Sequence, residues 1–265
     1  MLLAQISDLH ITPPGTLAYG CVDTAAYLAR AIDALNALDP RPDAVIVTGD
    51  LVDAGGIGEY EQLRGLLDRL AMPCHLLVGN HDDRANFRAV FGARAIVADD
   101  GFVHYAFDVA GVRVIALDTL DPGSGAGRLC AARLAWLEAR LDEARGLPVL
   151  IAMHHPPVVT GIGFMDAIRL APDDSAALDA LLRRYPNVGR IVCGHVHRAI
   201  TTAFGGTIAW CAPSTAHQVA LQLKPDGADA FVLEPPAFGL HLWRAETGFV
   251  THCRSVDQGD GSHPF

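Results

Sequence analysis

The sequence predicts an α/β fold built around mixed β-sheet. Short runs rich in Val, Ile and Leu alternate with longer segments whose apolar residues recur at helical spacing, which is typical of βαβ units. In the second half, apolar runs are separated only by short turns, which favours hairpins and antiparallel pairing. With 265 residues, of which 51% are hydrophobic and 19% charged, the chain is long enough to bury a sizeable core.

Each predicted element of the first 200 residues follows from one of two periodicities. A strand is expected where apolar residues run without a break, and a helix where they return every third or fourth position. In the helix expected first, for example, Leu28, Ile32 and Leu35 fall on one face. In chain order we expect a strand at 2–7, a helix at 24–38, a strand at 44–48, a helix at 59–70, a strand at 74–78, a hairpin formed by 103–109 and 112–118, a helix at 133–144, a strand at 148–153, a helix at 174–185 and a strand at 190–193.

The last third of the chain has a different character. Hairpin-like sequences occur at 205–213, 217–223 and 240–254. Residues 224–239 are rich in Pro and Gly, so we expect a loop that belongs to a cap or an interface. The final residues, 257–265, are expected to form a frayed tail.

Composition excludes several classes of protein. The net charge of −10 argues against binding of extended nucleic acid, whose phosphates would be repelled. No apolar run approaches the roughly 20 residues of a membrane span, and the N-terminus lacks a basic region and reaches Asp8 too soon for a signal peptide. We therefore expect a cytoplasmic protein that does not bind membranes. In that setting we expect free, buried thiols from the scattered cysteines, which are Cys21, Cys74, Cys130, Cys193, Cys211 and Cys253.

Five of the predicted strands end in a short burst of polar side chains. In an open α/β sheet, ligands bind outside the carboxyl ends of the strands, so these side chains are expected to converge on one crevice. In chain order the bursts contain Asp8 and His10, then Asp50 after Gly49, then Asn80, His81 and Asp82 after Gly79, then His154 and His155, and finally His195 and His197.

This collection of side chains predicts a metal centre. Imidazole and carboxylate without thiolate suit zinc, iron, manganese or cobalt at a catalytic site. The ligands are too numerous for one tetrahedral ion, and the D-x-H and H-x-H spacings point both members of each pair to the same side of an extended segment. Taken singly, each burst has another explanation; "NHD", for instance, is an ordinary start for a helix. Their joint occurrence favours two adjacent metals that share one carboxylate.

These motifs resemble those of the calcineurin-like metallophosphoesterases. Within that family, "LLAQISDLHI", "GNHDD", "MHHPPV", "CGHVH" and "STAHQV" are similar to class III cyclic-nucleotide phosphodiesterases and the related glycerophosphodiesterases. The resemblance covers residues 1–219. It implies a four-layer α-β-β-α sandwich of two mixed sheets flanked by helices. Residues 1–220 would form the catalytic domain, and residues 221–265 would form a C-terminal cap or oligomerisation segment that completes the same domain.

The resemblance also implies a role for each polar residue. One metal would be held by Asp8, His10, Asp50 and His197, and the other by Asp50, Asn80, His154 and His195, with iron, zinc, manganese or cobalt as candidates. Asp50 would bridge the metals, and His81 would act beside the leaving group. Substrate would be contacted by His10, Asn80, His81, His197 and His217.

Two of these positions keep alternatives. His81 could instead form a structural pair with Asp82, and His217 could be an ordinary strand histidine. His155 is expected to be structural.

The implied function is hydrolysis of small phosphodiesters, such as 3',5'-cyclic nucleotides or glycerophosphodiesters, by in-line attack of a metal-bridging hydroxide. A phosphomonoesterase is the main alternative, although only Arg84 and Arg198 lie near the motifs to grip a dianion. A non-catalytic protein-binding scaffold is disfavoured because every ligand position is filled. We expect Tyr19, Phe164, Met165 and the segment after Lys224 to form the pocket wall. The apolar "FVLEPPAFGLHLW" predicts a homo-oligomer, a dimer or higher.

Overall fold

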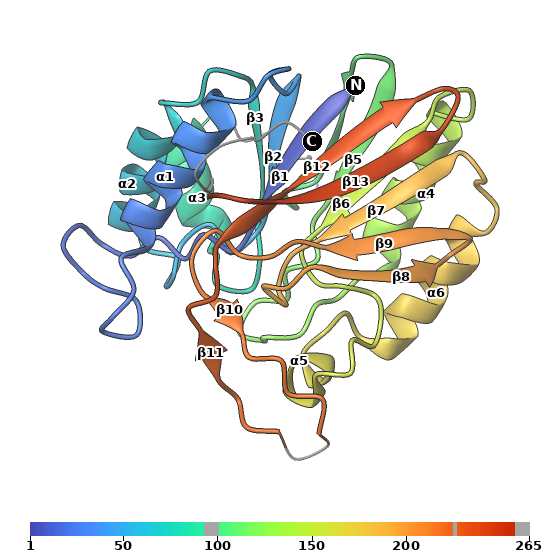
Figure 1. The fold of residues 1–265 in the computed structure, drawn as a ribbon. Helices are drawn as coiled ribbons and strands as arrows, with labels where there is room; N and C mark the ends of the chain where they lie inside the picture. Colours follow the sequence, from blue (N-terminus) through green and yellow to red (C-terminus); the bar gives the residue numbers. More distant parts are fainter. Residues whose placement is uncertain (93–100, 225–226, 258–265) are drawn as a thin grey trace.

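Two β-sheets pack face to face in the structure, which is a computed structural model that describes residues 1–92, 101–224 and 227–257 (Figure 1). The first sheet has the order β13-β12-β1-β2-β3, in which β1, β2 and β3 are parallel and β12 is antiparallel to both its neighbours. Its strands are β1 (Leu2–Ile6), β2 (Ala44–Thr48), β3 (Cys74–Leu77), β12 (Ala237–Arg244) and β13 (Gly248–Ser255).

The second sheet has the order β4-β5-β6-β7-β9-β8, with β5, β6, β7 and β9 parallel and an antiparallel strand at each edge. Both sheets are therefore mixed, as predicted. The strands of the second sheet are β4 (Tyr105–Val109), β5 (Val112–Leu117), β6 (Val149–Met153), β7 (Val188–Cys193), β8 (Ile200–Phe204) and β9 (Thr207–Cys211).

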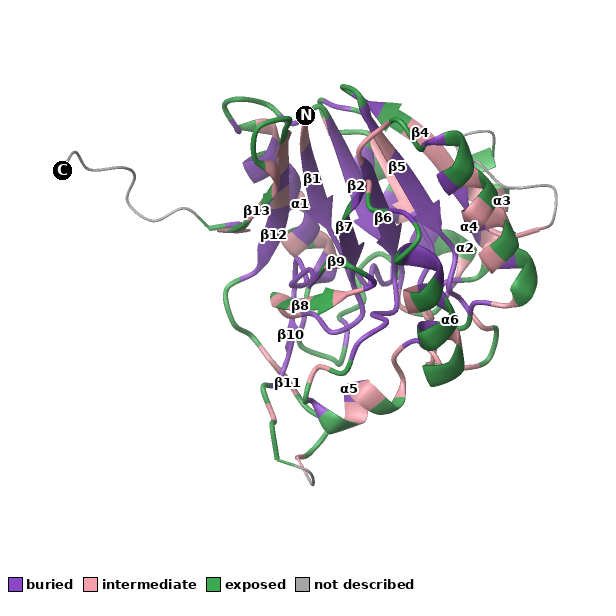
Figure 2. Ribbon diagram, turned by 90° about the vertical axis from the view of Figure 1, so that its right-hand side faces the viewer, coloured by how far each residue is buried: buried purple, intermediate pink, exposed green. Residues whose placement is uncertain are grey.

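Helices cover the outer face of each sheet, which completes the predicted four-layer sandwich (Figures 1 and 2). Successive side chains of a strand point to opposite faces. In β2, Val47 packs among the helices while Ile46 packs against the second sheet. The helices over the first sheet are α1 (Thr24–Asn36), α2 (Ile57–Leu67) and α3 (Arg84–Phe91), and those over the second sheet are α4 (Ala131–Glu143) and α6 (Pro172–Leu182).

Three short elements depart from the sequence-based expectation. The helix α3 begins directly after the "GNHDD" motif, where the Asp83 carboxylate accepts a hydrogen bond from the backbone N–H of Asn86 (2.8 Å). A five-residue helix, α5 (Gly163–Ala167), follows β6. The expected loop at 224–239 contains β11 (Phe231–Val232), which pairs with β10 (Gln218–Val219), and its last residues begin β12. These elements are too short to show a clear period in the sequence.

The carboxyl ends of the parallel strands face α5 and the β10–β11 pair (Figure 1). The loops that leave these ends are hydrogen-bonded to one another: the backbone N–H of Asp8 donates to Gly49 (3.1 Å), and that of Gly194 donates to His154 (3.0 Å). These hydrogen bonds hold neighbouring bursts together within each sheet, and the backbone N–H of His195, which donates to Oδ1 of Asp8, links the two sheets.

All six cysteines are free, as predicted, but only Cys193 and Cys211 are buried. Cys21 and Cys253 are exposed, so the expectation of uniformly buried thiols is wrong. Within the described parts of the chain, no helix has the length and apolar character needed to cross a membrane.

Candidate metal centre

The loops after β1, β2, β3, β6 and β7 bring all seven predicted metal ligands together. Six of them are buried and Asn80 is half-buried. Four of the seven offer nitrogen or oxygen atoms that lie within 4.8 Å of one another, and these are Asp8, His10, Asp50 and His197.

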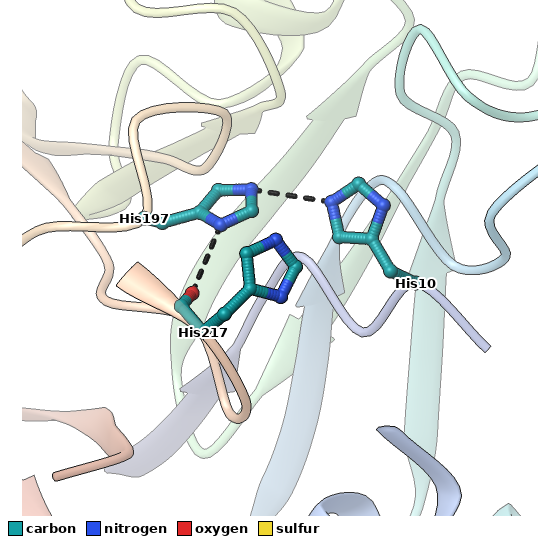
Figure 3. A group of neighbouring side chains, drawn as sticks. All are labelled: His10, His197 and His217. Atoms are coloured by element: carbon teal, nitrogen blue, oxygen red, sulfur yellow. Dashed lines mark hydrogen bonds between the residues drawn. The ribbon is translucent and has the colours of Figure 1, made fainter. Parts of the chain in front are cut away.

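In this first group, two imidazoles face each other across a small gap. The Nε2 atoms of His10 and His197 are 3.2 Å apart (Figure 3). The Nε2 atom of His10 also lies 3.7 Å from Oδ2 of Asp50, and that of His197 lies 3.5 Å from Oδ1 of Asp8. The four side chains therefore surround one point with two nitrogen and two oxygen donors.

A second group surrounds the other side of Asp50. The Nε2 atom of His154 is 3.4 Å from Oδ2 of Asp50 and 3.1 Å from Oδ1 of Asn80. The ring of His195 lies beside that of His154, with 5.1 Å between their centroids. Because Asp50 takes part in both groups, its carboxylate is placed to be shared between two neighbouring ions.

In His154 and in His197, a backbone carbonyl determines which ring nitrogen carries the hydrogen and which has a lone pair for a metal. The Nδ1 atom of His154 is 2.8 Å from the carbonyl oxygen of Thr48, and that of His197 is 3.1 Å from the carbonyl oxygen of His217. A carbonyl can only accept, so in each ring Nδ1 carries the hydrogen and Nε2 presents a lone pair to the cluster. This arrangement orients a histidine for metal binding.

Several buried polar atoms in the cluster, each a possible metal ligand, have no hydrogen-bond partner. They include Oδ2 of Asp8, Nε2 of His195 and Nδ1 of His217. A buried polar atom without a partner costs about 1–3 kcal/mol, so such atoms are rare in folded proteins. Metal ions would supply the missing partners for Asp8 and His195, and the carboxylate and imidazole donors suit divalent cations. The residues present therefore fit a metal centre.

The backbone of the cluster is strained. Of the seven non-glycine residues with positive φ in the described chain, five belong to the predicted ligand set: Asp8, His10, Asp50, His195 and His197. Such conformations cost about 1–3 kcal/mol each and persist only where neighbouring contacts impose them. One such contact is the hydrogen bond from the backbone N–H of His195 to Oδ1 of Asp8 (2.8 Å). The fold thus holds five ligand residues in backbone conformations that cost stability, which is typical of a functional site.

The electrostatics of the cluster favour positive charge next to Asp50. Burial alone would raise the pKa of Asp50, but the neighbouring His154 outweighs it and holds that pKa well below its ordinary value. The pKa of His154 is correspondingly raised to about 9, against the lowering effect of burial, chiefly by Asp50. Bound cations would provide this positive charge without protonating the imidazole.

The structure places His81 at the edge of the cluster and separates it from Asp82. Its Nδ1 atom is 2.7 Å from the carbonyl oxygen of Asp53, and its backbone N–H donates to Oδ1 of Asp50 (2.9 Å). Asp82 instead accepts hydrogen bonds from the backbone N–H groups of Leu51 and Gly79 and from the hydroxyl of Tyr60. The alternative of a structural His81–Asp82 pair is therefore wrong, and Asp82 shapes the loop that carries Asn80.

His155 has the structural environment expected for it. Its Nδ1 lies 2.8 Å from the hydroxyl of Thr119, and its Nε2 lies 3.2 Å from the carbonyl oxygen of Gly125. With both ring nitrogens occupied, it has no lone pair to offer the cluster.

His217 lies in the cluster rather than in an ordinary strand environment. Its ring centroid is 5.2 Å from that of His10 and 4.8 Å from that of His197 (Figure 3).

One residue near the cluster was missed by sequence reasoning. The Oδ1 atom of Asp53 lies 3.4 Å from Nδ1 of His10, while its backbone carbonyl faces His81. The only sequence signal is an acidic residue three positions after Asp50, in "GDLVD".

A cavity of about 280 Å³ opens onto the cluster. Its wall includes the three predicted residues Tyr19, Phe164 and Met165, together with Phe231 from the segment after Lys224. Among the described residues that line this cavity, none is Lys or Arg.

The two arginines near the motifs are engaged elsewhere. Arg84 donates to the buried carboxylate of Asp118 (2.7 Å), and Arg198 donates to Glu234 (2.9 Å). Neither lines the cavity.

Comparison with known proteins gives consistent results. A profile described as calcineurin-like phosphoesterase matches residues 1–199. The chain is 37% identical to a probable glycerophosphodiester phosphodiesterase GpdQ of Arcobacter nitrofigilis, over 100% of this chain and 97% of that protein. It is 31% identical to the 3',5'-cyclic adenosine monophosphate phosphodiesterase CpdA of Pseudomonas aeruginosa, over 94% and 89% of the two chains. The fold is similar to that of a dimetal phosphatase from Danio rerio, with a TM-score of 0.66, 17% identity, and 97% and 99% of the chains covered. The chain therefore belongs to the calcineurin-like phosphoesterase family.

Proposed function

We propose that this protein is a phosphodiesterase that uses two metal ions to hydrolyse small phosphodiesters. One observation carries the proposal: two groups of buried donors share Asp50 at the floor of a cavity whose described lining has no Lys or Arg. Bound metals would supply the positive charge that binds a phosphate ester and lowers the pKa of an attacking water. The metals we propose are iron, zinc, manganese or cobalt.

We assign the residues as follows. Asp8, His10 and His197 hold one metal with Asp50, while Asn80, His154 and His195 hold the other with the same carboxylate. His81 borders the cavity, and its backbone is fixed by its hydrogen bond to Asp50. Its Nδ1 donates to the carbonyl oxygen of Asp53, so it would reach the leaving oxygen through Nε2 and act as a donor there with both ring nitrogens carrying hydrogen. His217 lines the cavity beside His10 and completes the substrate contacts.

The cavity wall favours a diester over a monoester. A phosphomonoester carries about two negative charges at neutral pH, and enzymes that bind such groups commonly use bidentate arginines. Arg84 and Arg198 are engaged with acidic side chains instead. A diester carries a single charge and brings a second alcohol, for which the apolar wall of Phe164, Met165 and Phe231 offers a surface. The relatives whose names specify glycerophosphodiester or cyclic AMP hydrolysis support the same choice.

The first experiment is hydrolysis of bis(p-nitrophenyl) phosphate beside p-nitrophenyl phosphate by chelator-treated protein, before and after Mn²⁺ is restored. We expect activity only with metal and a clear excess of diester over monoester turnover. Faster turnover of the monoester would contradict the substrate assignment and leave the metal site intact. Failure to hydrolyse either substrate with any of the four metals would favour the scaffold alternative.

We also propose that the protein forms a homo-oligomer. The apolar stretch "FVLEPPAFGLHLW" predicted this, but the proposal now rests on exposed leucines near the β10–β11 pair. Most of the apolar stretch before Trp243 is used inside the protomer, where Phe238 is buried in β12. Three leucines near the β10–β11 pair remain exposed, namely Leu221, Leu223 and Leu233. Light scattering tests this proposal, because a monomeric mass at micromolar concentration would exclude it.

A further inference from the structure

A buried polar network connects the C-terminal hairpin to the ligand-bearing strand ends. Gln5 lies on β1 with its side chain between the two sheets, and it is completely buried. Its Nε2 atom donates to the hydroxyl of Thr48 in β2 (2.8 Å) and to the carbonyl oxygen of Cys193 in β7 (2.9 Å). One amide thus joins strands of both sheets.

The two strands joined by Gln5 are those that carry ligands immediately beyond it. Thr48 is followed by Gly49 and Asp50, and its carbonyl oxygen also accepts the hydrogen bond that orients His154. Cys193 is followed by Gly194 and His195. The contact between Gln5 and these two strands therefore lies directly behind the second group of donors.

The carbonyl of Cys193 fixes the orientation of the Gln5 amide, and the amide in turn fixes the tautomer of His241. The carbonyl of Cys193 can only accept, so Nε2 of Gln5 must face it, and Oε1 must face Nε2 of His241 at 3.0 Å. That ring nitrogen must carry the hydrogen. The other nitrogen, Nδ1, lies 3.0 Å from the hydroxyl of Thr251 on β13, which can donate to it. The imidazole is neutral, since burial lowers the pKa of His241 to about 3.

The junction leaves no room for adjustment. A methyl group added at Gly194 would overlap the hydroxyl of Ser7 and approach the carbonyl oxygen of Thr48 to 2.8 Å. The hydroxyl of Thr48 in turn donates to that of Ser7 (2.7 Å). A shift of β7 against β2 would therefore break hydrogen bonds or produce collisions within one residue of the cluster.

We propose that Gln5 and His241 form an inter-sheet clasp that positions the ends of β2 and β7, and so sets the spacing of His154 and His195 about Asp50. This inference rests on the proposed binuclear site. Both are positioning residues, because they reach the ligands only through Thr48 and Cys193. The clasp also gives the C-terminal segment a role in the metal centre, since His241 belongs to β12.

The test replaces Gln5, and then Gln5 together with His241, and measures metal binding rather than turnover. In Gln5→Met the side-chain length is kept and every hydrogen bond of the amide is lost. We expect the second equivalent of Mn²⁺ to bind about 10- to 100-fold more weakly by calorimetry. We also expect an altered exchange splitting in the electron paramagnetic resonance spectrum of the dimanganese form, because that splitting depends on the bridge between the ions.

A double variant separates positioning from stability. In Gln5→Met/His241→Phe the imidazole that lost its partner is also removed, so folding stability is expected to recover toward that of the wild type. The weak second metal and the altered spectrum should persist. Leu28→Ala, in the core under α1, is the control: it should lower stability and leave both metal readouts unchanged.

Two results would overturn the clasp. One is wild-type affinity and spectrum in Gln5→Met; the other is recovery of both readouts in the double variant. The proposed function fails in a different way, because wild-type protein would then bind fewer than two Mn²⁺ ions or show no diesterase activity.

Discussion

At the scale of single residues, Asp50 and His81 are adjacent in space but differ in what they can hold. The carboxylate of Asp50 faces both donor groups, whereas His81 meets Asp50 only through its backbone N–H. We predict that Asp50→Ala loses metal and activity together, while His81→Ala keeps metal and loses about 10²- to 10⁴-fold in kcat with the diester. Metal content and steady-state kinetics measure the two effects. His252→Ala, at an exposed histidine on β13, is the control; full activity in His81→Ala would refute the assigned role.

Asp53 tests whether a carboxylate orients His10. Asp53→Asn keeps the backbone carbonyl that faces His81 and removes the negative charge beside Nδ1 of His10. We predict a roughly tenfold loss of affinity for the first metal, because the imidazole loses the partner that favours a lone pair on Nε2. Calorimetric titration with Mn²⁺ measures the loss. Asp229→Asn removes the same charge from the exposed rim of the cavity, and an equal loss in that control would show that Asp53 acts only through overall charge.

The identity of the cluster was predictable because each ligand directly follows a strand of clear period. Asp53 was not predictable in this way, since its position depends on how the loop after β2 turns back toward His10. The same limit applies to Gln5 and His241, which contact each other across 236 positions of the chain. Their partnership depends on sheet order, which local periodicity does not encode.

At the scale of elements, Gly79 permits β3 to end against the cluster. A methyl group there would overlap the Asp50 carboxylate and come within 2.8 Å of Cε1 of His154. We predict that Gly79→Ala abolishes binding of the second metal, as measured by metal content after dialysis. Gly65→Ala is the matched control, because its added methyl meets nothing within 4 Å and it lies inside α2. That change should stabilise the fold by about 0.5–1 kcal/mol. Normal metal content in Gly79→Ala would contradict the tight packing.

The edge strand β3 also carries a pH-dependent contribution to stability. The ring of His75 stacks on Phe107 of β4 at 3.6 Å, and burial lowers the pKa of His75 to about 4. In the unfolded chain, the imidazole of His75 binds a proton near pH 6.5. The contribution of the neutral, buried ring to folding stability is therefore fully present above that pH and is lost as pH falls toward 4. Relative to His75→Phe, we predict that the wild type loses about 1 kcal/mol between pH 7 and pH 5, after allowance for the exposed part of the ring. Urea unfolding of both proteins measures this difference, and parallel pH curves would contradict it.

Elements with a clear apolar pattern were easier to predict than elements without one. The strand at 44–48 has the predicted bounds, and α1 begins at its predicted residue, where the carboxylate of Asp23 accepts from the N–H of Ala26. By contrast, α5 and β10 have no clear period of their own and pack together in one small apolar cluster that includes Met165 and Val219, while β11 is held by its pairing with β10. The segments that shape the pocket are therefore the ones that sequence reasoning describes least well.

At the scale of the whole molecule, the C-terminal segment is part of the first sheet. The strand β12 pairs with β1 in antiparallel register, from Leu2 opposite Leu242 to Gln5 opposite Gly239. On its other side, β12 pairs with β13. The sequence indicated hairpins here, but it could not indicate that they would return to the first strand of the chain. The resemblance to a known family supplied the four-layer arrangement that periodicity alone left open.

This topology predicts how truncation would act. A chain that ends at Lys224 would lose β11, β12 and β13, which would leave β1 as an unpaired edge and expose the face that Phe238 covers. We predict that it will not fold into a cooperative unit, as judged by circular dichroism and urea unfolding. A chain that ends at Asp257 keeps every described strand and is the control. If residues 1–224 unfold cooperatively with near-normal stability, the C-terminal segment is an independent cap. Failure of the shorter chain beside a normal control would instead mean that residues 221–265 complete the catalytic domain.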